Sequence, residues 1–312
     1  MENKYDIEDV IQNDKFIDSL SWIKNCQEKY IEILKYSDTS NKCDIMNYAP
    51  KLLLSIINNI INLDSCVKVP GWQKIQIIKC KNIFGKLSYN KKLRENGINK
   101  IIDYYKRNFY INDNSMIEEK KQNLNNLIEE IEELLKSKYN IKQKYQELSS
   151  SSYDWFTSFI FCVMPNINEA KEFLQKWSTI EISIMLWSFS YNLSISKQDL
   201  IQKWFREFFL NTMDMSQITE FTILILLFGM DYYVYYTISL FKHLLPTLQL
   251  LHQNKSLIPF LYLNENYLIP NEQQSFNTFR IHKYYDYMKN LQLKYRDFII
   301  NDFNELLLSN SI

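Results

Sequence analysis

Histidines are the side chains most often used for catalysis and metal binding, and this sequence places them poorly for either role. The three histidines are His243, His252 and His282. His243 and His252 stand nine positions apart, so they do not occupy adjacent turns on one helical face. The sequence also lacks the His-Glu-x-x-His pattern that holds zinc on a helix. These spacings predict no metal site.

Cysteines and paired acids are the other residues that could bind a metal or take part in catalysis. The five cysteines, Cys26, Cys43, Cys66, Cys80 and Cys162, are widely spaced and form no Cys-x-x-Cys. A zinc knuckle needs ligands two to four residues apart, so we expect free thiols in a reducing compartment. The pairs Glu129/Glu130 and Glu132/Glu133 fall where a solvated helix face is expected.

The glycines at 71, 85, 97 and 229 stand alone, so no glycine-rich phosphate loop is present. There is also no Gly-x-Ser-x-Gly elbow and no kinase signature set. We therefore expect that the protein is not an enzyme, that it uses no cofactor, and that it acts on no small-molecule substrate.

The segment 67–110 is the strongest electrostatic feature of the chain. It carries eleven Lys and Arg residues against two acids, Glu95 and Asp103, and aromatic residues lie between the cations. Cations can follow phosphates while exposed aromatic rings stack on unpaired bases. The candidate RNA contacts are Trp72, as a stacking platform, and Lys74, Lys79, Lys81, Lys91, Lys92, Arg94 and Arg107. The alternative is that the aromatics form the core, the lysines a solvated face, and the acids of 113–133 neutralise it.

Composition predicts which elements must position these residues. The chain has 312 residues, of which 46% are hydrophobic and 15% aromatic, but only four are glycine and six proline. Sheets need tight turns, and tight turns usually need glycine. We therefore predict an all-α fold of helical hairpins, either an α-solenoid or an irregular helical array, with one long central helix of coiled-coil character.

Apolar spacing places the expected helices. They cover 14–36, 45–63, and a long segment that starts at a Ser115–Glu118 capping box and continues to Leu148. Another is expected to be capped by Asn166, with Glu169 three residues later. The run Ser149–Ser152 suggests a boundary, which gives a helical region at 1–112, a long helix at 113–150 and a repeat-like domain at 151–312.

Two apolar segments of similar pattern begin at Ser178 and Ser216, each of which is expected to cap a helix. Ile180 corresponds to Ile218 at an offset of 38 residues, which is the length of one helix-turn-helix repeat. The apolar stretch 221–245 is interrupted by Asp231, and a central acid is costly in a bilayer, so we expect two buried helices there and no membrane span.

The sequence Ser183-Ile-Met-Leu-Trp-Ser-Phe-Ser190 resembles the helix signature of FAST-kinase-like, octotricopeptide and heptatricopeptide repeat families. Those families are arrays of α-helical hairpins that bind organellar RNA, so the resemblance implies an RNA-bound assembly. The segment around 215–229 is similar but lacks the Trp.

A second resemblance covers the same part of the chain. The residues from Trp204-Phe-Arg-Glu-Phe-Phe209 through Gly229 and 232–245 are similar to the C-terminal helices of TBC domains, which act on small GTPases. The family's arginine-finger motif, Ile-x-x-Asp-x-x-Arg, and its Tyr-x-Gln glutamine finger are not found. The resemblance therefore implies a binding module without the residues that accelerate GTP hydrolysis.

Together these patterns favour a non-catalytic scaffold or adaptor that binds other protein subunits, in an assembly that contains RNA if the basic segment contacts phosphates. The alternative is a degenerate TBC-like module that binds a small GTPase. The expected protein interface is an exposed apolar surface around Trp204, Tyr232, Tyr233 and Tyr236. The acidic N-terminus resembles neither a signal peptide nor a presequence, so we expect an intracellular, cytoplasmic protein, or a mitochondrial one if the repeat resemblance holds.

Overall fold

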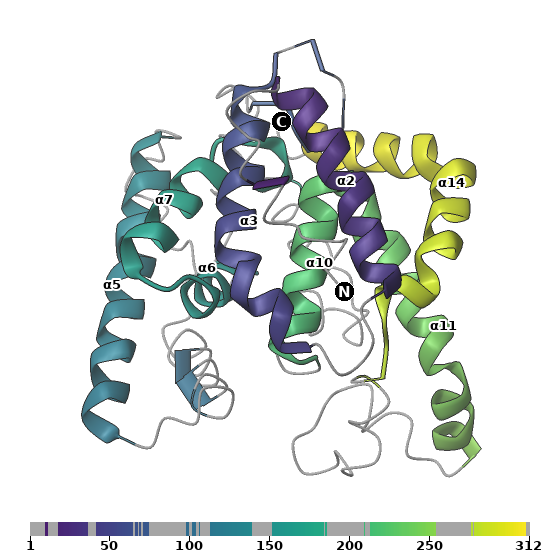
Figure 1. Ribbon diagram of the computed structural model, residues 1–312. Helices are drawn as coiled ribbons and strands as arrows, with labels where there is room; N and C mark the ends of the chain where they lie inside the picture. The colour runs from purple at the N-terminus through teal and green to yellow at the C-terminus, as the bar shows by residue number, and fades with distance from the viewer. Residues whose placement is uncertain are drawn as a thin grey trace, which may run out of the picture.

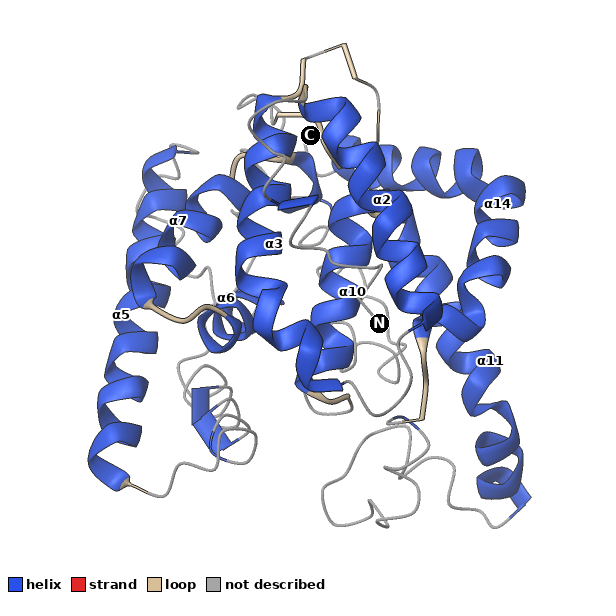
Figure 2. Ribbon diagram, in the orientation of Figure 1, coloured by secondary structure: helices blue, strands red, loops and turns tan. Residues whose placement is uncertain are grey.

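Helices form the repeating structure of this chain. The computed structural model describes residues 10–11, 18–36, 42–64, 66–67, 69, 71–74, 98–99, 102–103, 106, 113–138, 152–183, 185, 209, 213–253, 276 and 278–309. Within these ranges the regular elements are helical (Figure 2), and the β structure consists of an isolated antiparallel bridge between Lys74 and Ile180. The predicted all-α fold class is confirmed.

The described helices form two groups around a central pair (Figure 1). In chain order they are α2 (Ser19–Tyr36), α3 (Lys42–Asn62), α5 (Asn114–Lys138), α6 (Ser152–Val163), α7 (Ile167–Trp177), α10 (Met215–Phe228), α11 (Asp231–Gln253) and α14 (Ile281–Ser309). The central pair, α3 and α10, packs together. Helices α5, α6 and α7 pack beside α3 on one side, while α11 and α14 pack with α10 and α2 on the other.

Helix α10 is the most deeply buried element described. Eleven of its fourteen residues are buried, and most of them are apolar, as expected for a helix in the centre of a protein. Its polar members Thr219 and Thr222 donate their hydroxyl hydrogens to the carbonyls of Met215 and Ile218, each at 2.8 Å. These hydroxyls are therefore satisfied within the helix and need no water.

Both ends of α10 are closed by side chains. At its start, the Asp214 carboxylate accepts the Gln217 N–H at 3.0 Å, and the Gln217 side chain accepts the Asp214 N–H at 3.2 Å. At its end, the Leu226 carbonyl accepts the Trp72 indole N–H at 2.8 Å, and the Leu227 carbonyl accepts from the Gln27 amide at 2.5 Å. The last carbonyls of a helix have no partner within it, so these distant donors make burial of this end possible.

The segment 71–74 joins the end of α7 to α10. The Gly71 carbonyl accepts the Ile182 N–H at 3.2 Å, and the Gln73 carbonyl accepts the Glu181 N–H at 2.8 Å. Gly71 has a φ of 91°, in the left-handed region that favours glycine. A Cβ at this position would meet Cγ1 of Ile182 at 2.2 Å, so the close approach of the two segments also requires glycine.

The helix caps agree with the sequence only in part. The Asn166 side chain accepts the Glu169 N–H at 2.9 Å and caps α7, as predicted. The cap of α5, however, is Asp113, which accepts from the Ser115 N–H and hydroxyl, so Ser115 itself is not the capping residue. Asp has two acceptor oxygens, and its preference for this position equals that of Ser.

The second half of the chain also departs from the repeat that was predicted. Ser178, expected to cap a new helix, is the C-cap of α7, and α10 is capped by Asp214 rather than Ser216. Ile180 lies in the bridge to Lys74, whereas its counterpart Ile218 lies inside α10. The two segments therefore adopt different structures at these equivalent positions.

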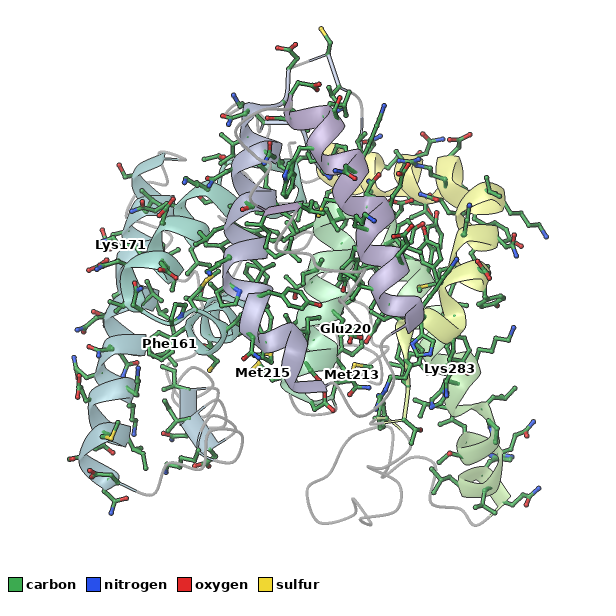
Figure 3. All side chains as sticks on the ribbon, in the orientation of Figure 1. Phe161, Lys171, Met213, Met215, Glu220 and Lys283 are labelled. Atoms are coloured by element: carbon green, nitrogen blue, oxygen red, sulfur yellow. The ribbon has the colours of Figure 1, made fainter. Side chains whose placement is uncertain are left out.

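The buried residues form one core that runs from Val10 to Phe303 and includes side chains on both sides of the predicted boundary at 149–152. Helix α3, which matches the predicted helix 45–63, contributes a stripe of adjacent pairs to this core, with Leu52, Leu53, Ile56, Ile57 and Ile60 buried. The predicted helix from Ser115 is α5 and is described as far as Lys138. Lys171 of α7, which Figure 3 labels, forms a salt bridge at 2.5 Å with Glu130 of α5.

The first prediction concerns the close approach at Gly71. The substitution Gly71→Ala places a side chain in a left-handed conformation and against Ile182, and should lower the free energy of unfolding by roughly 2–4 kcal/mol. Urea denaturation measures this loss. The double variant with Ile182→Ala should show a smaller added loss than the sum of the two single variants, because the smaller side chain makes room. Wild-type stability for Gly71→Ala would contradict the described contact.

Candidate functional site

The predicted stacking platform is part of the core. Trp72 is only 4% exposed, and its indole N–H donates to the Leu226 carbonyl. This correction has a physical reason: the ring fills the space beside the end of α10 and supplies a donor that this buried end needs, so it is not available to a base. Lys74 is exposed, whereas Lys79, Lys81, Lys91, Lys92, Arg94 and Arg107 lie outside the described residues.

The predicted protein interface is likewise internal. Tyr232, Tyr233 and Tyr236 are each at most 1% exposed, so they do not form the exposed apolar surface that was expected; Trp204 lies outside the described residues. Tyr233 and Tyr236 pack on Phe221 of α10, with ring centroids 5.0 and 4.5 Å apart. Burial raises the pKa of both tyrosines well above the ordinary value. Their role is to hold α11 against α10.

A different surface of α11 is exposed and apolar. Val234, Ile238, Phe241, Leu245 and Leu248 follow a three-four spacing, which places them on one side of the helix. Ile238 is 39% and Leu245 50% exposed, while the other three are half-buried and pack in part against the core. We call these five residues the outer stripe of α11. Such a stripe is typical of a helix that packs against a partner.

Charge is almost absent from this helix. From Tyr232 to Gln253 the formal charge comes from Lys242 alone, with His243 and His252 as further titratable groups. The Lys242 ammonium lies 3.7 Å from the centroid of the Tyr287 ring on α14. His243 contacts the Tyr284 hydroxyl and the Thr278 hydroxyl, each at 3.0 Å. The side chains of Lys242 and His243 thus contact Thr278 and the first turns of α14. The outer stripe contains no charged residue.

A buried ionisable group lies at the other end of α11. Asp231 is fully buried, and its Oδ2 is 3.7 Å from Nε of Arg296 and 3.5 Å from Nε2 of Gln292. Burial raises the pKa of this carboxyl, while Arg296 and Gln292 act in the opposite direction. In the sequence Asp231 is recognisable only as an interruption of an apolar run, because its partners lie about sixty residues away.

The described residues give little sign of other chemistry. No group of three or more His, Cys, Asp or Glu side chains among them is arranged to hold a metal ion. None of the helices described here combines the length and apolar character needed to cross a bilayer. Burial raises the pKa of the Cys162 thiol to about 12, so it is not a reactive thiolate at neutral pH.

Comparison with known proteins identifies the family. The family model described as the Broad-minded protein Rab TBC domain matches residues 2–198 and 188–306. The chain belongs to this family. The predicted resemblance to TBC domains is therefore confirmed, and it extends far beyond the C-terminal helices that suggested it. The resemblance to RNA-binding helical repeats receives no support from this match.

Two curated relatives show the same likeness. The chain is 27% identical to protein broad-minded of Mus musculus over 109 residues, 35% of this chain and 8% of that protein. It is 20% identical to protein broad-minded of Danio rerio over 237 residues, 62% of this chain and 17% of that protein. The chain thus matches less than a fifth of either relative's length. No solved structure matches significantly.

The second prediction tests the structural role of Trp72 in this TBC-type fold. Trp72→Phe keeps most of the ring but removes the donor to Leu226, and an unsatisfied buried carbonyl should cost about 1–3 kcal/mol. Amide hydrogen exchange should also accelerate in the last turn of α10. Trp22→Phe is the matched control, because the Trp22 indole donates at the same 2.8 Å to the carbonyl of Val10 and not to a carbonyl of α10. Equal exchange of α10 in both variants would contradict the assigned role.

Proposed function

We propose that this chain is a non-catalytic TBC-type module that binds a small GTPase of the Rab class and leaves its hydrolysis rate unchanged. The observation that carries the proposal is the family match over residues 2–198 and 188–306, together with the two finger motifs that the sequence lacks. The match supports a GTPase-binding fold, and the missing motifs separate binding from catalysis.

The arginine finger of a TBC domain has a large effect on the rate of GTP hydrolysis. By stabilising charge on the transferring phosphoryl group, such a residue accelerates GTP hydrolysis by about 10³–10⁵-fold. Neither Ile-x-x-Asp-x-x-Arg nor Tyr-x-Gln occurs in the sequence. A protein that binds the GTPase without these groups stabilises the ground state and the transition state of hydrolysis equally. The barrier between the two states is then unchanged, so the rate of GTP hydrolysis stays the same.

The outer stripe of α11 is the surface that best fits such a partner. Protein interfaces have an apolar, uncharged centre, and the stripe contributes five apolar side chains with no acid between Tyr232 and Gln253. Covering exposed side chains such as Ile238 and Leu245 would contribute about 1.5–3 kcal/mol each if burial is complete. Tyr233 and Tyr236 fix the opposite side of the helix on α10, so the stripe is held in place before the partner arrives.

The third prediction is a direct assay of binding and turnover. The purified chain is mixed with a panel of Rab-class GTPases loaded with GTP or GDP; complex formation is followed by calorimetry and phosphate release by single-turnover kinetics. We expect at least one GTP-loaded member to bind, with phosphate release at its intrinsic rate. Acceleration of phosphate release would contradict the non-catalytic assignment, and absence of binding across the panel would contradict the GTPase as partner.

The fourth prediction locates the interface. Ile238→Asp and Leu245→Asp should each weaken binding by about tenfold or more, since a factor of ten corresponds to 1.4 kcal/mol. Leu293→Asp is the matched control, because Leu293 is an exposed leucine (78%) that belongs to α14 and not to the stripe. If Leu293→Asp weakens binding and the two stripe variants do not, the interface is elsewhere.

A further inference from the structure

Asp231 is a buried carboxylate whose polar contacts are long and incomplete. Its Oδ2 is 3.5 Å from the Gln292 amide and 3.7 Å from the Arg296 guanidinium, both longer than the ordinary range of such contacts. Its Oδ1 has no hydrogen-bond partner among the described residues. The Tyr235 hydroxyl acts on the same carboxylate but does not reach hydrogen-bond geometry. A charge here is therefore only partly compensated.

The groups around Asp231 come from two helices. On α11 they are Tyr232 and Tyr235, and on α14 they are Tyr285, Gln292, Arg296 and Asp297. The Tyr232 hydroxyl donates to the Gln292 side chain at 3.1 Å, which makes Gln292 a bridge between the helices. From α10, the apolar ring of Phe228 covers Tyr232, with centroids 5.1 Å apart. Arg296 is the cation of this cluster and is itself partly exposed.

The cluster contacts a stretch of α14 whose apolar packing on the core is limited to half-buried side chains such as Leu291 and Ile299. Between Met288 and Phe303, no side chain of α14 is fully buried. Within this stretch, Leu293 is 78% and Phe298 67% exposed. Segments with few buried contacts open locally at a lower free energy than the core. The contacts of Gln292 and Arg296 with Asp231 are therefore expected to contribute to the stability of this part of α14 on α11.

We propose that Asp231, Gln292 and Arg296 form a proton-sensitive latch that fixes α14 on α11. The latch is tighter when Asp231 is protonated and neutral, and it opens more readily when the carboxylate is ionised. Ionisation leaves a charge with an unsatisfied oxygen in a dry site, and opening gives that charge access to water.

The direction of the pH dependence follows from linkage. Burial raises the pKa of Asp231 in the closed state above the value of a solvated carboxyl. The closed state therefore binds the proton more tightly than the open state does. The stabilisation is complete below the solvated pKa and is lost as the pH rises through the closed-state pKa. A latch dominated by the ion pair with Arg296 would show the opposite direction.

Hydrogen exchange of the whole 312-residue chain tests the latch. Amide exchange of residues 289–302, corrected for the intrinsic rate, is followed from about pH 4, near the pKa of a solvated Asp, up to about pH 8. We expect protection in the wild type to fall as the pH rises. Asp231→Asn, which is neutral at every pH, should remove this dependence and slow exchange several-fold at the upper end. Faster exchange in Asp231→Asn at that pH would overturn the proposal.

Two further variants separate the latch from general effects. Asp297→Asn removes the neighbouring exposed carboxylate and should leave the pH dependence as in the wild type; its loss in this variant would overturn the assignment to Asp231. Arg296→Gln should accelerate exchange of 289–302 near neutral pH, but not in the Asp231→Asn background. An equal acceleration in both backgrounds would show that Arg296 acts independently of Asp231. Residues 215–228 of α10 serve as the internal reference in every sample.

Discussion

The burial of α10 on every side is the constraint on which the rest of this structure depends. A helix with so few exposed residues leaves little access for water to its terminal backbone groups, so protein groups must satisfy them. Asp214 and Gln217 meet this need at the start, and Trp72 and Gln27 at the end. The donors at the end come from parts of the chain about 150 and 200 residues earlier. One helix end thus specifies how distant segments of the chain must assemble.

The same constraint explains the crowding around α10. Helices α2, α3 and α11 pack on it, and the Gln217 amide also donates to the carbonyls of Phe276 and Phe279 at 3.0 and 2.9 Å. Tyr30 of α2 donates to the Glu220 carbonyl at 3.0 Å. These contacts fix α11 in turn, since its tyrosines pack on α10. The outer stripe and the Asp231 cluster therefore belong to a helix whose inner side packs on α10.

The fold class could be predicted because it depends on local rules. Four glycines cannot serve the turns of a large sheet, and the pairs of α3 from Leu52 onward recur every four residues, as a buried helical stripe must. The Asn166 cap was found because its partner, Glu169, is three residues away. The cap of α5 was placed at Ser115, but the structure has Asp113 there, because Asp suits a cap as well as Ser does and lies only two residues away. Pro246 lies inside α11, although proline more often ends a helix.

The positions of the candidate functional residues could not be predicted in the same way. An aromatic residue among lysines has the same local pattern whether its ring is outside or inside, and Trp72 is inside because a carbonyl of α10, far along the chain, needs its donor. Tyr232 and Tyr236 looked like a surface cluster for the same reason. The outer stripe escaped notice because α11 is apolar nearly all round, so spacing alone could not show which side faces the core. The polar partners of Asp231 lie on α14, so its environment could not be inferred from the residues near it in the sequence.

Native-state hydrogen exchange in increasing urea tests the central role of α10 most directly. If α10 is the element on which the fold depends, its central amides should exchange only through global unfolding, with a free energy equal to that from urea denaturation and at least as high as that of any other helix. The opposite ranking, with α10 exchanging at a lower free energy while α3 and α11 stay protected, would contradict the account.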